Sequence, residues 1–373
     1  MANWQLLNNE AAAKSWDEAL LRLDDYTPFQ TYAWGEYQRA LGWEPRHWAA
    51  FNEHGEIVAM MLGLLRRYPL GVGLIWSQGG PVGDLSVCDE SFQQAIKQTT
   101  GFKRIYCRFR CDRQRQVEDS LKLNAQGWRR SWSNLNTGYS LRLDLAKDES
   151  QLLAGCERNW RRNLRRAWEN NLTVQQWTNP SVDEIVSAYD SMQSLKGLDE
   201  QHSRKEFENL IVHLKDQLVL YRGTNEQGQL VSLHGWLILG NRATAFLSVT
   251  TEQGRQLHSS YAVIWAMIQH CLQLQLRSCD LGGIDPVLNA GPYRFKKATG
   301  AVPVEYLGEW DWASGPWLQW FGNWAISRRQ RLSKAESALK TSRRSASSKP
   351  LPDSRPLCGE SRSRAELSQP GMA

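Results

Sequence analysis

Sequence motifs for several common classes of enzyme are missing from this chain. It contains no GxxxxGK[ST] loop, no GxGxxG turn, no HExxH pair and no GxSxG elbow. Without these motifs, the sequence does not indicate a P-loop nucleotide site, a dinucleotide site, a zincin centre or an α/β-hydrolase nucleophile. The sequence therefore argues against metal chemistry and nucleotide hydrolysis, and we expect no bound metal or cofactor.

Cysteine pairs and long apolar runs are also lacking. The seven cysteines form no CxxC pair, and no histidine pair stands near them at metal-ligand spacing. The longest apolar run, Ile57–Leu65, is far short of the roughly 18 residues that a membrane span needs. The N-terminus lacks a basic start followed by an apolar segment. We expect a cytoplasmic protein with reduced thiols and no transmembrane segment.

Charge is spread unevenly along the 373 residues. The formal net charge is +6, but residues 327–373 contain 11 Lys and Arg against 4 Asp and Glu, which leaves the rest of the chain nearly neutral. This tail is rich in Ser and Pro and poor in apolar residues, so it cannot bury enough surface to offset the entropy of ordering. We predict a disordered basic tail, with nonspecific attraction to polyanions as its functional option.

Two segments resemble each other at an offset of 173 residues: NEHGEIVAMMLGLL begins at Asn52, and NEQGQLVSLHGWLI begins at Asn225. Each predicts a glycine turn between two strands. Chance similarity and two copies of one α/β unit both explain the match. We predict an α/β fold with tandem domains at 1–145 and 146–326. Apolar periodicity predicts helices over 11–23, 32–41, 157–170, 182–195, 203–214 and 261–274.

The segment ERNWRRNLRRAWEN predicts a helix with one arginine face, opposite Trp160, Leu164 and Trp168. A charge run of this kind is often only a solvated surface. Guanidinium groups without interleaved acids repel one another, however, which favours a bound polyanion such as pyrophosphate or an RNA backbone. The arginines at helical spacing are Arg158, Arg161, Arg162, Arg165 and Arg166.

A second candidate site lies in QGRQLHSSYAVIWAMIQ, where His258, Ser259 and Ser260 precede an amphipathic helix whose apolar stripe begins at Tyr261. The serines are typical N-caps. The free backbone N–H groups and the positive end of the helix dipole would equally bind a phosphate.

The stretch DLGGIDPVLNAGPYRFKKATG combines a short apolar strand end, two glycines and a pair of lysines. Gly282 and Gly283 would let a ligand or another backbone approach where side chains would collide. The carboxyl end of a strand is where α/β sheets commonly bind ligands. A tight turn followed by solvated lysines is the alternative.

Several motifs together resemble the Fem-type (FemABX) peptidyltransferases over about residues 28–312. They are FQTYAWGEYQRALGW, GGPVGD, RNLRRAWENNLTV, DLGGID with RFKKATG, and VEYLGEWDW. The resemblance implies two domains similar to GNAT acetyltransferases, which agrees with the internal duplication. It also implies an enzyme that takes amino acids from aminoacyl-tRNA and adds them to the peptide stem of a cell-wall precursor.

The resemblance implies roles for individual residues. Lys296, directly after Phe295 in RFKK, would stabilise the oxyanion formed when an amine attacks an ester. No side chain stands out as general base: Asp285, which we count among the catalytic residues, His234 and Glu305 are all possible, and proton removal by the substrate itself is equally open. The predicted substrate-binding residues are Gln30, Trp34, Arg158, Arg161, Arg162, Arg165, Ser259, Ser260, Tyr261, Gly282, Gly283, Arg294 and Phe295.

The expected partners are aminoacyl-tRNA as co-substrate and a peptidoglycan precursor, either lipid II or a UDP-linked peptide, with peripheral contact at the inner membrane face. Gln38 stands where the family often has a lysine, and RFRCD lacks the family's acid–proline pattern, so the donor is better supported than the acceptor. Two alternatives are an acyl-CoA-dependent (acetyl-CoA) N-acyltransferase acting on a sugar or peptide, and a non-enzymatic RNA-binding or scaffold protein.

Overall fold

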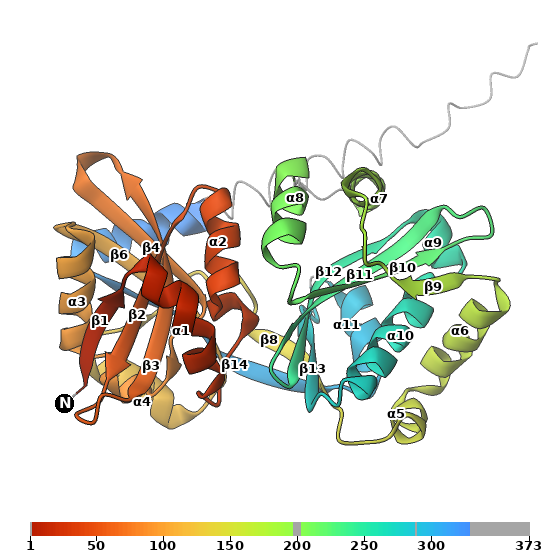
Figure 1. Cartoon of the computed structure of the whole chain (residues 1–373), viewed down its shortest axis with the longest axis horizontal. Coiled ribbons are helices and arrows are strands. Elements are labelled where there is room, and N and C mark those ends of the chain that lie inside the picture. Colours follow the sequence, from red (N-terminus) through yellow and green to blue (C-terminus); the bar gives the residue numbers. More distant parts are fainter. Residues whose placement is uncertain (1, 197–202, 288, 329–373) are drawn as a thin grey trace, which may run out of the picture.

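The computed structural model describes residues 2–196, 203–287 and 289–328. Two α/β lobes lie side by side (Figure 1). Hydrogen bonds join their strands into one mixed sheet in the order β1-β2-β3-β4-β6-β14-β8-β13-β12-β11-β10-β9, with β5 paired to β3 and β7 to β14. The predicted α/β class is confirmed.

The N-terminal lobe packs its helices against an antiparallel meander. Side chains of Asn8, Thr31 and Asp89 cap the helices α1, α2 and α3, as short polar residues do at N-termini. Its strands are β1 (Asn3–Leu7), β2 (Glu44–Phe51), β3 (Ile57–Tyr68), β4 (Val72–Gly79), β5 (Val82–Gly83), β6 (Arg104–Gln114) and β7 (Arg129–Arg130). Its helices are α1 (Asn9–Leu21), α2 (Tyr32–Ala40), α3 (Glu90–Thr100) and α4 (Val117–Ala125), with 3₁₀ turns η1 (Pro28–Gln30), η2 (Pro69–Gly71) and η3 (Leu85–Val87).

The C-terminal lobe repeats this plan and adds helices on its outer side. Its strands are β8 (Tyr139–Asp144), β9 (Thr173–Gln176), β10 (Leu218–Thr224), β11 (Leu230–Leu239), β12 (Arg242–Thr250), β13 (Ser278–Gly283) and β14 (Val302–Ala313). Its helices are α5 (Glu149–Gly155), α6 (Arg158–Glu169), α7 (Val182–Lys196), α8 (Arg204–His213), α9 (Glu252–Gln256), α10 (Ser259–Gln273) and α11 (Ala290–Lys297). All six helices expected from periodicity are present, with ends shifted by at most a few residues.

The two similar segments fold into the same hairpin turn. The Asn52 side-chain oxygen accepts from the backbone N–H groups two and four residues later, at 3.0 and 2.9 Å. Asn225 accepts from the same relative positions at 3.1 and 2.9 Å. Gly55 and Gly228 carry the positive φ, +78° and +74°, that each turn requires. Identical turn chemistry at both sites supports duplication over chance.

Two strands connect the lobes. The first part of β14 pairs with β8, from Val302 to Glu305, and the rest pairs with β6 as far as Ala313. β8 precedes residue 146 but pairs with β13 and β14, so the sheet runs across the predicted domain boundary. The exact division of the chain at residue 146 stays a prediction.

The parallel strand pair at the centre of each lobe differs between lobes. In the N-terminal lobe β4 and β6 stay paired along the whole of β4. In the C-terminal lobe β12 and β13 pair only from Arg242 with Ser278 to Thr244 with Asp280. Residues 245–250 of β12 then continue without a β13 partner, which opens the sheet at that point.

A further helix over residues 316–328 follows β14. It includes the first two residues of the predicted disordered tail, so that prediction is wrong for residues 327 and 328, while residues 329–373 lie outside the described residues. Within the described part of the chain, no helix combines the length and apolar character that a membrane crossing requires. The six cysteines of this part are buried and unpaired.

Candidate active site

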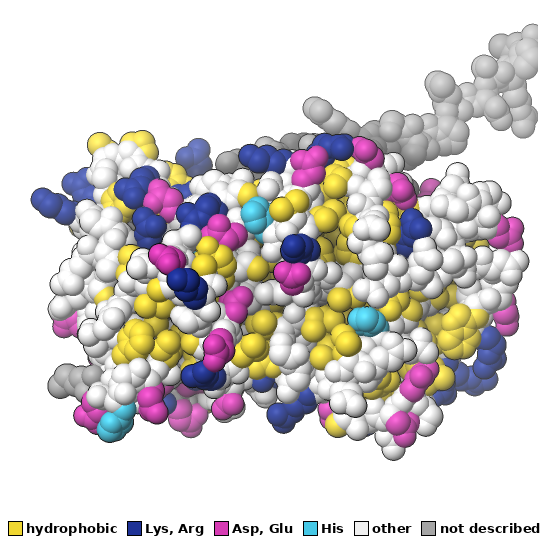
Figure 2. All heavy atoms as spheres, in the orientation of Figure 1, with side chains coloured by type: hydrophobic (Ala, Val, Ile, Leu, Met, Phe, Trp, Pro, Cys, Tyr) yellow, Lys and Arg dark blue, Asp and Glu magenta, His cyan; other side chains and the backbone are white. Residues whose placement is uncertain are grey.

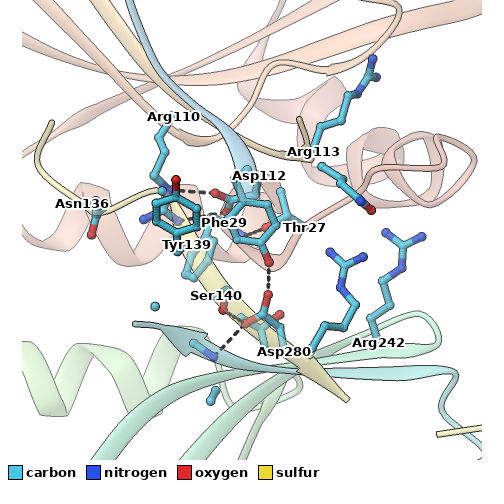
Figure 3. Close-up of a pocket in the computed structure, with 18 of the residues that line it drawn as sticks. Thr27, Phe29, Arg110, Asp112, Arg113, Asn136, Tyr139, Ser140, Arg242 and Asp280 are labelled. Atoms are coloured by element: carbon cyan, nitrogen blue, oxygen red, sulfur yellow. Dashed lines mark hydrogen bonds and ion pairs between the residues drawn. The ribbon is translucent and has the colours of Figure 1, made fainter. Parts of the chain in front are cut away.

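A cavity of about 860 Å³ lies between the two lobes and is lined by both. Figure 3 shows Arg110 and Asp112 of β6 facing Ser140 of β8 and Asp280 of β13. Charged side chains of both signs line the space. The arginines are Arg110, Arg113, Arg142, Arg242 and Arg277, and the acids are Asp24, Asp25, Asp112, Asp144, Asp280 and Asp285.

Two of these arginines are held by carboxylates of their own lobe. Arg110 forms a two-point ion pair with Asp112, at 2.8 and 3.0 Å. Arg113 donates to Asp25 at 2.8 and 3.0 Å. Within the described residues, the side chains of Arg142 and Arg277 make no hydrogen bond or ion pair. These two guanidinium groups are therefore available to an anionic ligand.

Arg242 fastens the rim of the cavity across the lobes. Its guanidinium donates to the Asp24 carbonyl at 2.6 Å and lies over the Tyr26 ring, 4.3 Å from the centroid. The Tyr26 hydroxyl in turn donates to the Asn241 side chain at 2.7 Å. The loop that leads into η1 is thus fixed to the start of β12.

Asp280 lies on the floor of the cavity, where β12 and β13 separate. Its carboxylate accepts from the Gly282 backbone N–H at 2.7 Å and from the hydroxyls of Ser140 and Tyr306. Burial raises the pKa of Asp280 above its ordinary value, against the lowering effect of the hydrogen bonds from Ser140 and Gly282. The carboxylate is thereby held in one orientation.

Lys296 is fixed against the glycine pair. Its ammonium donates to the carbonyls of Gly282 at 3.3 Å and Gly283 at 3.1 Å. Burial lowers the pKa of Lys296, while the nearby Asp280 opposes that shift. Lys297 is exposed and lies over the Tyr293 ring instead, 5.7 Å from its centroid. The two adjacent lysines therefore have different surroundings, as the sequence predicts.

Gly282 cannot be replaced without disturbing this arrangement. Its φ is +81°, and an added Cβ would lie 3.2 Å from the Ala245 carbonyl oxygen and 3.5 Å from the Lys296 Nζ. A side chain there would be strained and would crowd the ammonium. The glycine lets the β13 backbone pass close to β12 and to Lys296 at once.

Phe295 joins an aromatic cluster behind the glycine turn. Its ring meets Tyr261 edge-on, 4.8 Å between centroids, and lies 6.5 Å from Trp160. The Tyr261 hydroxyl accepts from the Asn163 amide at 3.0 Å. The cluster ties α11 to α10 and α6, and so fixes the helix that carries Lys296.

At the start of α10, where the sequence predicts a phosphate site, both serine hydroxyls form hydrogen bonds with other groups of the protein. Ser259 is buried and donates to the Gly254 carbonyl at 3.0 Å, and Ser260 bonds the Thr250 hydroxyl at 2.6 Å. His258 before them has a positive φ of 55°. These serines shape the turn, so a ligand here would contact backbone N–H groups and not the hydroxyls.

The arginine face of α6 is exposed, and dark-blue side chains gather over this helix in Figure 2. Arg161 is partly buried and donates to the Ala154 carbonyl at 2.7 Å. Trp160 and Leu164 are buried as predicted, but Trp168 is 57% exposed. Its assignment to the apolar face is wrong because the helix turns it to solvent near its C-terminal end.

Gln30 and Trp34 lie away from the interlobe cavity. Gln30 is fully buried, and its amide bonds the Leu62 N–H and the Gln78 carbonyl, both at 2.7 Å. Its position is structural, which argues against its predicted role in substrate binding. Trp34 is also buried but lines a second cavity of about 680 Å³ together with Gln38 and residues of α8.

The three candidates for general base lie in different surroundings. Asp285 lines the cavity and accepts from the Val287 N–H at 2.9 Å. His234 is buried in β11, and Glu305 forms an ion pair with Arg115. Arg294 is exposed on α11. Only Asp285 lies where the cavity would bring a substrate.

Sequence reasoning missed several residues that the structure brings to the cavity, chiefly Asp280, Ser140, Tyr306, Arg142 and Arg242. Asp280 carried a usable signal, since an acid inside a buried strand needs hydrogen-bond partners. The other four had no local signal. They come from strands that meet only in the folded sheet.

Residues 193–325 match the model of the FemAB family. A solved structure described as FemX has 16% sequence identity and a TM-score of 0.70, and the similarity covers 83% of this chain and 96% of that chain. The matched part of the chain is thus similar to the FemAB family, and the chain as a whole shares the fold of FemX.

Two other solved structures share the fold of this chain. A tandem GNAT protein from the clavulanic acid biosynthesis pathway has 12% identity, covers 85% of this chain and 99% of its own, and gives a TM-score of 0.54. The C-terminal domain of a putative lysylphosphatidylglycerol synthetase from Agrobacterium fabrum has 15% identity, coverage of 87% and 98%, and a TM-score of 0.52. No curated protein matches the chain. The predicted double GNAT-like architecture is confirmed.

Proposed function

We propose that this protein, like the Fem-type enzymes that it resembles, transfers an aminoacyl group from aminoacyl-tRNA to an amine of a peptidoglycan-precursor peptide. The observation that carries the proposal is the Lys296 ammonium held on the carbonyls of Gly282 and Gly283, because these two glycines line the cavity between the lobes. A fixed positive charge at the place where two β-strands separate suits an acyl-transfer reaction.

The reaction needs one new bond and one broken bond. The acceptor amine attacks the carbonyl carbon of the aminoacyl ester, the C–N bond forms, and the ester C–O bond breaks to release the terminal ribose hydroxyl of the tRNA. Lys296 has three N–H donors. Two of them face the glycine carbonyls, which leaves the third for the ester oxygen as negative charge develops.

The proton lost by the amine has to reach the departing ribose oxygen. Asp285 at the cavity is the candidate that would accept it first. Asp280 has a different task, because its carboxylate already accepts from three donors. It would orient the Tyr306 hydroxyl and the Gly282 backbone next to the ester.

The two substrates would approach from different sides. The exposed arginines of α6 form a surface for the phosphate backbone of the tRNA. Arg142 and Arg277 would bind the anionic groups of the precursor inside the cavity. Because the rest of the body is nearly neutral, we expect anionic groups of the substrates to bind mainly at the α6 face and at Arg142 and Arg277.

The deciding experiment offers labelled aminoacyl-tRNA and labelled acetyl-CoA separately, each with a UDP-linked precursor peptide and with an extract of lipid-linked precursor. We expect label to pass from the tRNA to the peptide, and Lys296→Met to abolish most of the transfer. Transfer from acetyl-CoA alone would establish the acyl-CoA alternative, which the similarity in fold to a tandem GNAT protein favours. Binding of tRNA without transfer from either donor would make the chain an RNA-binding protein and overturn the proposal.

A further inference from the structure

The helix over residues 316–328 is attached to the protein by its polar side. Asn323 is buried, donates to the Asp311 carboxylate at 2.9 Å and accepts from the Trp132 N–H at 3.1 Å. Gln319 donates to the other Asp311 oxygen at 2.7 Å. Gly322 lies so close to the Tyr106 ring that an added Cβ would come within 2.6 Å. The helix is therefore firmly seated, behind the N-terminal lobe in Figure 1 (blue).

Its other side presents aromatic rings to solvent. In a surface helix of a soluble protein the apolar side normally faces the core, whereas here the arrangement is inverted. Two of the rings stack on each other, with 6.3 Å between the centroids of Trp320 and Trp324. The exposed fractions are 83% for Trp317, 48% for Trp320, 54% for Phe321 and 39% for Trp324. We call these four residues the aromatic stripe.

Positive charge adjoins the aromatic stripe. The Arg328 guanidinium lies over the Trp324 ring, 5.4 Å from its centroid. In the sequence, residues 328–349 contain eight Lys and Arg against one Glu. Aromatic side chains next to a run of cations are the pattern by which interfacial helices bind anionic bilayers, since the rings enter the headgroup region and the cations face the lipid phosphates.

We propose that the helix 316–328 docks on the surface of an anionic lipid bilayer, with the aromatic stripe inserted at headgroup depth and Arg328 against the phosphates. Charge complementarity distinguishes this occupant from a second copy of the chain, because two copies would bring their basic segments together. The docking is independent of the transfer reaction, but it would hold the interlobe cavity near any lipid-linked acceptor.

The test uses the full chain with two kinds of vesicle, one of phosphatidylcholine alone and one of equal parts phosphatidylcholine and phosphatidylglycerol. We expect pelleting only with the anionic vesicles and quenching of tryptophan emission by brominated lipid. Trp317→Ser, Trp320→Ser and Phe321→Ser combined should weaken binding roughly tenfold or more, because much apolar surface no longer enters the interface. Trp168→Ser, which removes an exposed tryptophan elsewhere, should bind as the parent chain does.

Three outcomes would overturn the proposal. One is equal binding to both kinds of vesicle, and another is unchanged binding of the triple variant to anionic vesicles. The third is a chain that is dimeric without lipid and becomes monomeric in the triple variant, which would make the stripe a self-association surface. The triple variant should keep its melting midpoint and its transfer to a soluble UDP-linked peptide, so failure here is distinguishable from failure of the proposed function.

Discussion

The two lobes share a hairpin but differ in the parallel strands beside it. Their turns carry the same asparagine and glycine hydrogen bonds. In the N-terminal lobe β4 and β6 are paired along β4, whereas β12 and β13 separate after Thr244 and Asp280. Within the described residues, the opening in the sheet and the lysine that faces a glycine pair both belong to the C-terminal lobe. The two lobes share the hairpin, and the separation of the parallel strands distinguishes the lobe that holds the candidate catalytic residues.

The N-terminal lobe contributes in another way. It supplies one wall of the cavity through the Arg110–Asp112 and Arg113–Asp25 ion pairs. These charges are paired within the lobe, in contrast to Arg142 and Arg277 across the cavity. The N-terminal lobe therefore contributes a rigid wall to the cavity, and the C-terminal lobe contributes the arginine side chains that could bind a ligand.

The strongest test of the comparison is at the lysine pair. Lys296→Met should lower kcat by about a hundredfold to a thousandfold, the usual cost of losing one oxyanion donor. Lys297→Met, whose ammonium is exposed, should stay within a few fold of the parent enzyme. Single-turnover assays on both variants measure this. Equal and small losses would remove the catalytic distinction between the two lobes.

Acid should weaken the N-terminal lobe through His47. Burial lowers the pKa of His47 to about 4, with help from Arg39 and Arg46. The folded state then binds fewer protons than the unfolded state, so stability is full above the ordinary pKa and falls as the pH drops toward 4. The loss should reach about 3 kcal/mol by about pH 4.

Urea unfolding of His47→Gln across this pH range measures the effect. The variant should lack most of this part of the pH dependence. The exposed His54→Gln variant serves as the control and should follow the parent curve. Parallel pH curves for the His47 variant and the parent would show that His47 titrates normally in the fold.

A smaller effect is expected on the arginine face of α6. Replacing Arg161, Arg162 and Arg165 together by Gln should raise KM for aminoacyl-tRNA on the order of tenfold and flatten its salt dependence, because fewer phosphates are neutralised. The melting midpoint should hardly change, since the apolar side of the helix is untouched. KM measured at two salt concentrations checks this. A large loss of stability at unchanged KM would show that these arginines do not bind tRNA and that the face is an ordinary solvated surface.

The smallest predicted effects compare the two turn asparagines. Asn225→Ala should cost about 1–2 kcal/mol, because the side chain is buried and its amide also donates to Gln253 of α9 at 3.1 Å. Asn52→Ala should cost about half as much, since that side chain is only half-buried and its amide reaches Glu56 alone. Urea unfolding of both variants gives the difference. Equal costs would show that the two turns are equivalent in energy as well as in geometry.

Local patterns in the sequence account for most of the secondary structure. The helices, the duplicated hairpin and the contrast between Lys296 and Lys297 follow from periodicity, glycine turns and neighbouring side-chain directions. Trp168 was misplaced because a helical wheel does not show where the lobe ends beneath the helix. The family resemblance added the double domain, which the hairpin match alone left open.

These local patterns could not predict contacts between residues that are far apart in the sequence. Arg110, Ser140 and Asp280 are far apart in the chain and meet only because β6, β14, β8 and β13 lie in that order in the sheet. Nothing in VEYLGEWDW indicates that one strand serves two lobes. The aromatic stripe was likewise missed, since the exposure of a tryptophan depends on which side of its helix is attached.

The shared strand β14 determines what happens when the chain is cut. A fragment that ends near residue 145 would lose the strand that completes the sheet beside β6. It would also leave the buried Arg108 without Glu309, to which it donates at 2.9 Å, and an unpaired buried charge costs about 3–5 kcal/mol. The two halves of the chain should therefore not yield separate soluble proteins, although they share a hairpin and an α/β plan. The N-terminal lobe depends on a strand from the C-terminal half of the chain to complete its sheet.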